Sequence, residues 1–140
     1  MNGARVLLLV ALAGVGACAS APSGSFSAPI VGTWDYVATQ ESPTTASISG
    51  TLKVDNQSDG NFTGSLSFTL TPSGEGSPQT MTGPLTGQSV SATAVEFDAC
   101  LDGCTVPWTH LGLIAGDSLV GSWAQQGGPS GSFRAHRTAP

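Results

Sequence analysis

The sequence predicts an all-β protein, folded as an eight-stranded up-and-down antiparallel barrel. After residue 30, apolar residues alternate with Ser, Thr and other polar residues, which is the period of half-buried strands, and no window has helical spacing. A glycine also stands two positions before a large apolar residue six times, and such residues share one face of a strand. Small barrels use this alternation to fill their interior and to bend. The six pairs are Gly32/Trp34, Gly50/Leu52, Gly64/Leu66, Gly83/Leu85, Gly121/Trp123 and Gly131/Phe133.

Eight segments fit short strands, and the short gaps between them favour a meander. Pro84 lacks a ladder donor, so the fourth strand is expected to be short, bulged or exposed at that nitrogen. The expected strands are Val31–Thr39, Ala46–Val54, Phe62–Thr71, Met81–Leu85, Val90–Phe97, Val106–Ile114, Leu119–Trp123 and Gly131–Arg137.

The loops are expected to differ between the two ends of the barrel. Those at the end reached by the first strand are longer and richer in Pro and Gly, which is typical either of a ligand mouth or of loops that vary freely. They are Gln40–Thr44, Pro72–Pro78, Asp98–Gly103 and Gln125–Ser130.

Residues 1–17 are predicted to be a signal peptide, with Arg5 before a short apolar run. Val15-Gly16-Ala17-Cys18 resembles the lipobox of bacterial lipoproteins. The resemblance implies that Cys18 is lipidated, becomes the new N-terminus and carries acyl chains such as palmitate, which hold a protein stably on a membrane. In a Gram-negative host, Ala19 resembles the signal for sorting to the outer membrane, facing the periplasm. The alternative is ordinary cleavage after Ala19 or Ala21, which would discard Cys18.

The chain is then divided into the signal peptide, a lipidated and flexible tether at 18–29, and a barrel domain at 30–140. Only 9% of the residues are charged, and removal of residues 1–17 leaves nine acidic residues against Lys53, Arg134 and Arg137, a net charge of −6. No basic stripe is available to neutralise phosphates, so nucleic-acid binding is not expected.

Cys100 and Cys104 are the two thiols left once Cys18 is lipidated, and an exported protein meets an oxidising compartment. We expect a disulfide between them, closing a small loop and contributing only about 2 kcal/mol in the chain-entropy model. The spacing is not Cys-x-x-Cys, which argues against a redox role. With only His110 and His136 as further ligands, no metal site is expected, and no cofactor is predicted.

Gly116-Asp117-Ser118-Leu119 matches the nucleophile block of the Gly-Asp-Ser-Leu hydrolases. In that family the block lies near the N-terminus of an α/β fold, and a downstream Asp-x-x-His supplies the base. Neither feature is present here, and a serine without a positioned base is a weak nucleophile. We interpret Gly116-Asp117 as a hairpin turn and expect the protein not to be an enzyme, with an esterase as the minor hypothesis.

Gly32-Thr33-Trp34 at the first strand and Arg137 at the last resemble the calycins, which are the lipocalins, fatty-acid-binding proteins and avidins. In those families an Arg near the C-terminus lies across the Trp of strand one and closes one end of the barrel. The resemblance implies that Arg137 makes a cation–π contact with Trp34 at the floor. The chain is shorter than lipocalins and lacks the aromatic ligand set of avidins, so the ligand type is not carried over.

Two functional hypotheses follow for a lipocalin-like barrel. In the first, it binds a small apolar or amphipathic molecule at the end with the long loops, where Tyr36, Phe68, Trp108 and His110 line a cavity. In the second, side chains fill the barrel, which then serves as a structural or protein-interaction module. An interior of eight strands is just wide enough for either. For the tryptophans and His110, the alternative to a ligand contact is an ordinary place in the core.

Overall fold

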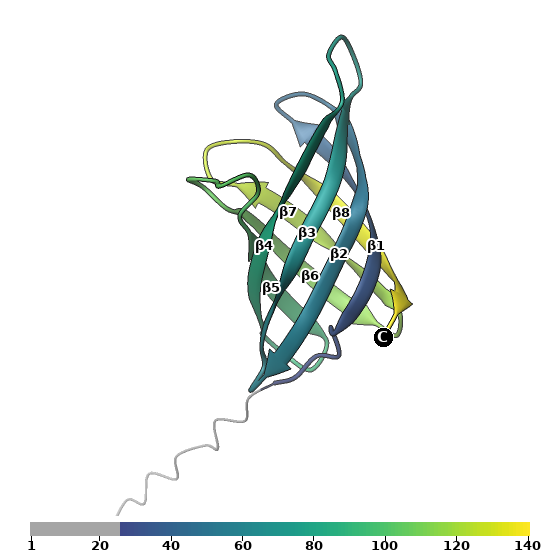
Figure 1. Cartoon of the computed structure of the whole chain (residues 1–140), viewed down its shortest axis with the longest axis vertical. Coiled ribbons are helices and arrows are strands. Elements are labelled where there is room, and N and C mark those ends of the chain that lie inside the picture. The colour runs from purple at the N-terminus through teal and green to yellow at the C-terminus, as the bar shows by residue number, and fades with distance from the viewer. Residues whose placement is uncertain (1–25) are drawn as a thin grey trace, which may run out of the picture.

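The computed structural model describes residues 26–140, which form a closed barrel of eight antiparallel strands in chain order (Figure 1). No residue in this range is helical, and none therefore belongs to a helix long and apolar enough to span a bilayer. The strands are β1 (Gly32–Ser42), β2 (Ala46–Ser58), β3 (Asn61–Pro72), β4 (Gln79–Ser89), β5 (Ala94–Ala99), β6 (Trp108–Ala115), β7 (Ser118–Gln125) and β8 (Ser130–Ala139). Pairing of β1 with β8 closes the barrel, so the predicted fold class is confirmed.

The large member of each of the six glycine-led pairs is buried, as the alternation predicts. At five of the six glycines, the neighbouring strand comes so close that a side chain would overlap its backbone. A β-carbon at Gly121 would lie 1.8 Å from the carbonyl oxygen of Leu111, and one at Gly64 would lie 1.9 Å from that of Lys53. Glycine therefore makes room for close approach of strands as well as for the large residue two positions away.

The upper end of the barrel in Figure 1 carries the connections β1–β2, β3–β4, β5–β6 and β7–β8, and the lower end carries the other three and the segment leading into β1. The expected difference in loop length holds only in part, because the β4–β5 turn at the lower end (residues 90–93) is longer than the β1–β2 turn at the upper end (residues 43–45). Several strand bounds differ from those expected. β2 continues to Ser58, β4 runs over 11 residues, and β6 begins only at Trp108.

The prediction that β4 is short was wrong, and the reason lies in the surroundings of Gly87 and Pro84. Gly87 faces inward beneath the ring of Phe62, so the strand continues past Leu85 although its later residues are not apolar. Pro84 is tolerated because its carbonyl and nitrogen face the side where β5 has already ended, and the carbonyl accepts a hydrogen bond from Cys100 N. The other expectation, that the Pro84 nitrogen is exposed and has no strand partner, was correct.

The start of β5 was also predicted wrongly. Residues 90–93 form the turn between β4 and β5, in which the Ser91 hydroxyl accepts hydrogen bonds from the backbone N–H groups of Thr93 and Ala94. Val90, expected to begin the strand, is therefore 46% exposed in that turn. A serine hydroxyl that accepts hydrogen bonds from the backbone of its own turn competes with strand pairing. The alternation of apolar and polar residues does not reveal this competition.

Cys100 and Cys104 form the expected disulfide in the loop between β5 and β6. β5 pairs with only the lower part of β4, and the disulfide loop continues the edge of β4 beyond it through the hydrogen bond from Asp102 N to Thr82 O. Leu101 enters the core from this loop and is 2% exposed. The loop thus closes the barrel wall where β5 ends.

The signal peptide, Cys18 and residues 18–25 of the predicted tether lie outside the described residues. The rest of that tether is packed on the barrel. Ala28 is fully buried, its N–H donates to the Ser89 hydroxyl at 2.9 Å, and its carbonyl accepts from Gln57 Nε2 at 2.8 Å. The expected boundary between tether and domain at residue 30 is therefore too late, because Ala28 and Ile30 seal the lower end.

Candidate functional site

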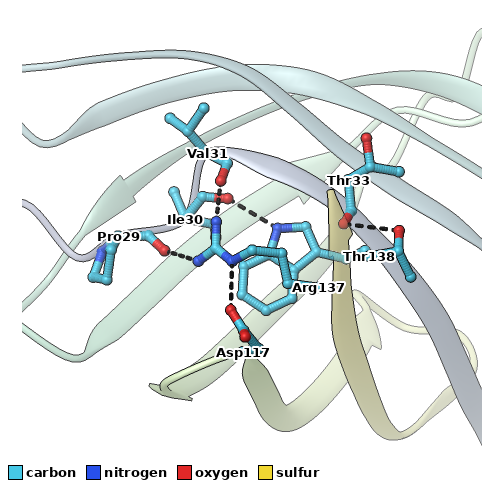
Figure 2. A network of polar contacts seen from close by, with 8 residues as sticks. Pro29, Ile30, Val31, Thr33, Asp117, Arg137 and Thr138 are labelled. Atoms are coloured by element: carbon cyan, nitrogen blue, oxygen red, sulfur yellow. Dashed lines mark hydrogen bonds and ion pairs between the residues drawn. The ribbon is translucent and has the colours of Figure 1, made fainter. Parts of the chain in front are cut away.

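At the floor of the barrel, Arg137 of β8 lies across Trp34 of β1, and Figure 2 shows the polar contacts that surround Arg137 there. The guanidinium carbon is 4.2 Å from the ring centroid, the contact that the resemblance to calycins implies. Arg137 also donates hydrogen bonds to the carbonyls of Val31 and Pro29, and its Nε pairs with Asp117 Oδ1 at 3.2 Å. One arginine thus ties β8, the segment before β1 and the turn between β6 and β7 together.

Trp34 is fully buried, and its indole N–H donates to the carbonyl of Ile30 at 2.9 Å. The segment that precedes β1 is held over the ring by this bond and by Arg137 (Figure 2). The floor therefore consists of a tryptophan with a satisfied N–H, covered by backbone, and offers no free polar group to a ligand.

Replacement of Arg137 by methionine is expected to lower the free energy of unfolding by about 2 kcal/mol. The variant leaves two backbone carbonyls without their charged donor and removes the cation–π contact. Asp117→Asn is the control, because that carboxylate is exposed and its pairing contributes little. Urea denaturation of both variants measures the difference, and equal midpoints would show that the floor contacts do not stabilise the fold.

The four residues predicted to line a ligand cavity, Tyr36, Phe68, Trp108 and His110, all lie inside the barrel, at 0–4% exposure. They pack on one another and on neighbouring rings. Tyr36 stacks on Phe68, with centroids 6.1 Å apart, and Phe68 contacts Trp108 at 5.2 Å. The structure brings these four residues together as part of the core.

His110 and Tyr36 form a buried polar pair. Tyr36 Oη lies 2.9 Å from His110 Nε2, and His110 Nδ1 lies 2.9 Å from the carbonyl of Trp108. Because a carbonyl only accepts, Nδ1 carries the proton and Nε2 accepts from the tyrosine hydroxyl. Among residues 26–140, no buried side-chain nitrogen or oxygen lacks a hydrogen-bond partner.

Burial sets the protonation states of this pair. Desolvation lowers the pKa of His110 to about 4, against smaller opposing contributions from the hydrogen bond to Trp108 and the charge of Asp98. Desolvation also raises the pKa of Tyr36 above its usual value. At neutral pH the pair is therefore uncharged.

Aromatic rings of four further residues complete the filling of the barrel. His110 stacks on Phe97 at 4.4 Å, and Trp108 stacks on Trp123 at 4.4 Å. Trp123 donates its indole N–H to the carbonyl of Thr39 at 3.2 Å. Phe62 and Phe133 contact Phe97 edge-on. Among residues 26–140, Leu70 and Met81, near the upper rim, are the partly buried hydrophobic residues that pack against this core.

Ser118, the serine of the hydrolase-like block, begins β7 and is exposed. It lies opposite His136 of β8, which in turn lies opposite Asp35 of β1. No hydrogen bond joins these three side chains, and Gly116-Asp117 forms the expected turn. A row of exposed residues in register lacks the enclosed, hydrogen-bonded base that activates a serine. Within residues 26–140 no three potential metal ligands gather.

An exposed apolar area on β6, β7 and the adjoining turn between β4 and β5 was not anticipated from the sequence. It comprises Val90, Leu111, Leu113 and Val120, which are 46–59% exposed, and we call these four residues the β6–β7 patch. Leu113 and Val120 are direct cross-strand partners. Beside them a hollow of about 420 Å³ lies over the paired glycines Gly112 and Gly121.

The fold and its core define a closed, eight-stranded β-barrel with an aromatic interior. No protein-family model matches the chain, and no curated protein matches it. Among solved structures it is similar to a redesigned β-barrel, mFAP1, bound to DFHBI (TM-score 0.63, 13% identity, 76% of this chain and 94% of that one). It is also similar to a fluorescence-activating β-barrel designed de novo (TM-score 0.57, 16% identity, 77% and 93%). At these identities the likeness concerns the fold alone.

Proposed function

We propose that this protein is a non-enzymatic lipoprotein of the bacterial cell envelope that acts through its outer face as an interaction module. The β6–β7 patch is the observation that carries this proposal. The opposite wall, formed by β2 and β3 (Figure 1), presents mostly serine and threonine to solvent. Leucines that are more than half exposed on an otherwise hydroxyl-rich barrel are typical of a surface that another molecule covers.

The interior supports the same proposal. A molecule bound among Tyr36, Phe68, Trp108 and His110 would have to displace aromatic rings that contact each other and break the hydrogen bond between Tyr36 and His110. Each such change leaves a cavity or a buried polar atom without a partner, which costs several kcal/mol. Binding to the outer face requires no such rearrangement.

In this proposal, a lipid anchor at Cys18 holds the barrel at a membrane. In a Gram-negative host, that membrane is the outer membrane and the barrel faces the periplasm. Cells grown with radiolabelled palmitate are expected to incorporate label into the full chain. A Cys18→Ser variant is expected to lose both the label and its recovery with membranes. Unlabelled wild-type protein released in soluble form would exclude the anchor.

The interaction itself can be tested with a single photoreactive label in native membranes. With Cys18 lipidated and Cys100 bonded to Cys104, a Leu113→Cys variant offers one free thiol for a benzophenone maleimide. Illumination is expected to give a covalent adduct from position 113. The matched control is Ser67→Cys on the exposed face of β3, from which no adduct is expected. Equal results at both positions would contradict an interaction through the patch.

A second candidate function is binding of a small apolar ligand at the upper mouth. It is favoured by Leu70 and Met81, which are partly buried near the rim, and by the solved barrel of similar fold that is bound to DFHBI. Titration of tryptophan fluorescence with lipids and hydrophobic dyes tests it. Saturable quenching that is lost in Met81→Glu but kept in Val37→Thr, an exposed position on β1, would support this function. A flat response across the panel would exclude it.

A further inference from the structure

The β6–β7 patch is flanked by opposite charges. Glu96 of β5 lies opposite Leu111 on one side, and Arg134 of β8 lies opposite Val120 on the other. Glu96 is half-buried, and the exposed Asp98 of β5, which accepts a hydrogen bond from the Thr109 hydroxyl at 2.6 Å, adds a second acid to the first side. Among residues 26–140, the ion pairs are Lys53 with Asp55 and Arg137 with Asp117, and Arg134 has no acidic partner among those residues.

We propose that the β6–β7 patch binds the same patch of a second copy of this chain, forming a two-fold dimer. A two-fold axis directed along the barrel brings β5 of one copy against β8 of the other. Glu96 then faces Arg134 of the second copy twice, once on each side of the apolar centre. A patch with acid on one edge and base on the other is complementary to itself only in this arrangement.

The shape of the patch fits the same arrangement. The leucines at 111 and 113 project beside a hollow of about 420 Å³, whose floor is the backbone of the inward-facing glycines Gly112 and Gly121. Each copy therefore supplies both a projecting side chain and a place to receive one. The centre becomes apolar and the edges charged, which is the usual organisation of an interface.

The position of the N-terminus agrees with this axis. The chain enters the barrel at its lower end (Figure 1), and an axis along the barrel keeps the lower ends of both copies on the same side. Two chains anchored at Cys18 are then able to dimerise on one membrane. The lipid surface itself is a poorer occupant of the patch. Near that end, Asp55 and Asp117 are paired with Lys53 and Arg137, and Asp59 adds a further acid, so the described residues there offer no excess of positive charge to anionic headgroups.

This inference rests on the proposed function, because it names the partner of the same patch. Sedimentation velocity of the full chain in detergent micelles measures its mass. Wild-type protein is expected to sediment as a dimer, whereas Leu113→Ser, Glu96→Arg and Arg134→Glu are expected to weaken the dimer at least tenfold. The double variant Glu96→Arg/Arg134→Glu is expected to restore it, because the charges are exchanged. Val37→Thr, outside the patch, is the control and should behave as the wild type.

The two proposals fail in different ways. The dimer proposal is wrong if the wild-type chain is monomeric. It is also wrong if the double charge exchange does not restore the dimer. If the label at position 113 then forms an adduct with a different protein or with lipid, the interaction function stands and only its partner changes. If position 113 gives no adduct at all, both proposals are wrong. Circular dichroism of each variant separates loss of association from loss of folding.

Discussion

Replacement of Gly131 by alanine is expected to be the most damaging single-methyl change in the barrel. A β-carbon there would lie 1.7 Å from the carbonyl oxygen of Thr39 and 2.8 Å from its carbonyl carbon. Both atoms belong to the backbone of β1, so no flexible side chain can move aside. Because β8 pairs with β1 to close the barrel, relief of the overlap requires the closing seam to separate. We expect a loss of at least about 3 kcal/mol.

The comparison with Gly74 isolates this effect. Gly74 lies in the turn between β3 and β4, where an added β-carbon would meet no atom within 4 Å. Neither glycine has a positive φ, so the two variants differ in available space and not in backbone strain. Urea unfolding is expected to leave Gly74→Ala within about 0.5 kcal/mol of the wild type. Similar midpoints for the two variants would mean that the seam tolerates a side chain and that glycine is not needed there.

The alternation of glycine and large residues was enough to predict the barrel, its strand order and the inward faces. A strand has only two faces, so once Trp34 and Leu52 are assigned to the interior, every second residue follows. The resemblance at the two ends of the domain located the contact between Arg137 and Trp34, because a closed meander of eight strands returns to its first strand. These parts of the structure depend on local periodicity and on chain order.

The parts that the sequence did not reveal depend on hydrogen bonds or on packing between distant segments. Ser91 ends β4 with a hydroxyl-bonded turn, and Leu101 fills the wall where β5 stops. Ala28 looks like tether by composition, but Gln57 and Ser89 hold its backbone against the floor. None of these contacts has a repeating pattern.

The sequence of β6 contains a pattern that indicates the β6–β7 patch. Leu111 and Leu113 are apolar on the outward face of β6, while His110 and Ile114 occupy the inward face. A strand that is apolar on both faces, next to strands that alternate strictly, indicates an outer face that is covered. The same reasoning shows why the ligand-binding hypothesis could not be decided from the sequence. Inward aromatic residues fill a small barrel or line its cavity with the same alternation.

Acid is expected to destabilise the protein through His110. In the unfolded chain this histidine takes up a proton near pH 6.5, whereas burial lowers its pKa in the folded barrel to about 4. Between these values the unfolded state binds more protons, so the free energy of unfolding falls as the pH is lowered. The contribution is fully present above pH 6.5 and is lost by about pH 4, where the folded state also takes up the proton. Over that window the loss amounts to roughly 3 kcal/mol.

Two variants assign this dependence to one residue. His110→Gln removes the titration and keeps a side chain that accepts a hydrogen bond from Tyr36, so its stability is expected to change much less between pH 6.5 and 4.5. His136→Gln removes the exposed histidine of β8 and is expected to retain the wild-type slope. Urea unfolding at a series of pH values measures all three proteins, and the ionisable groups that the three proteins share contribute equally to each. An equally steep slope in His110→Gln would contradict the assignment, because the proton taken up on unfolding would then belong to another group.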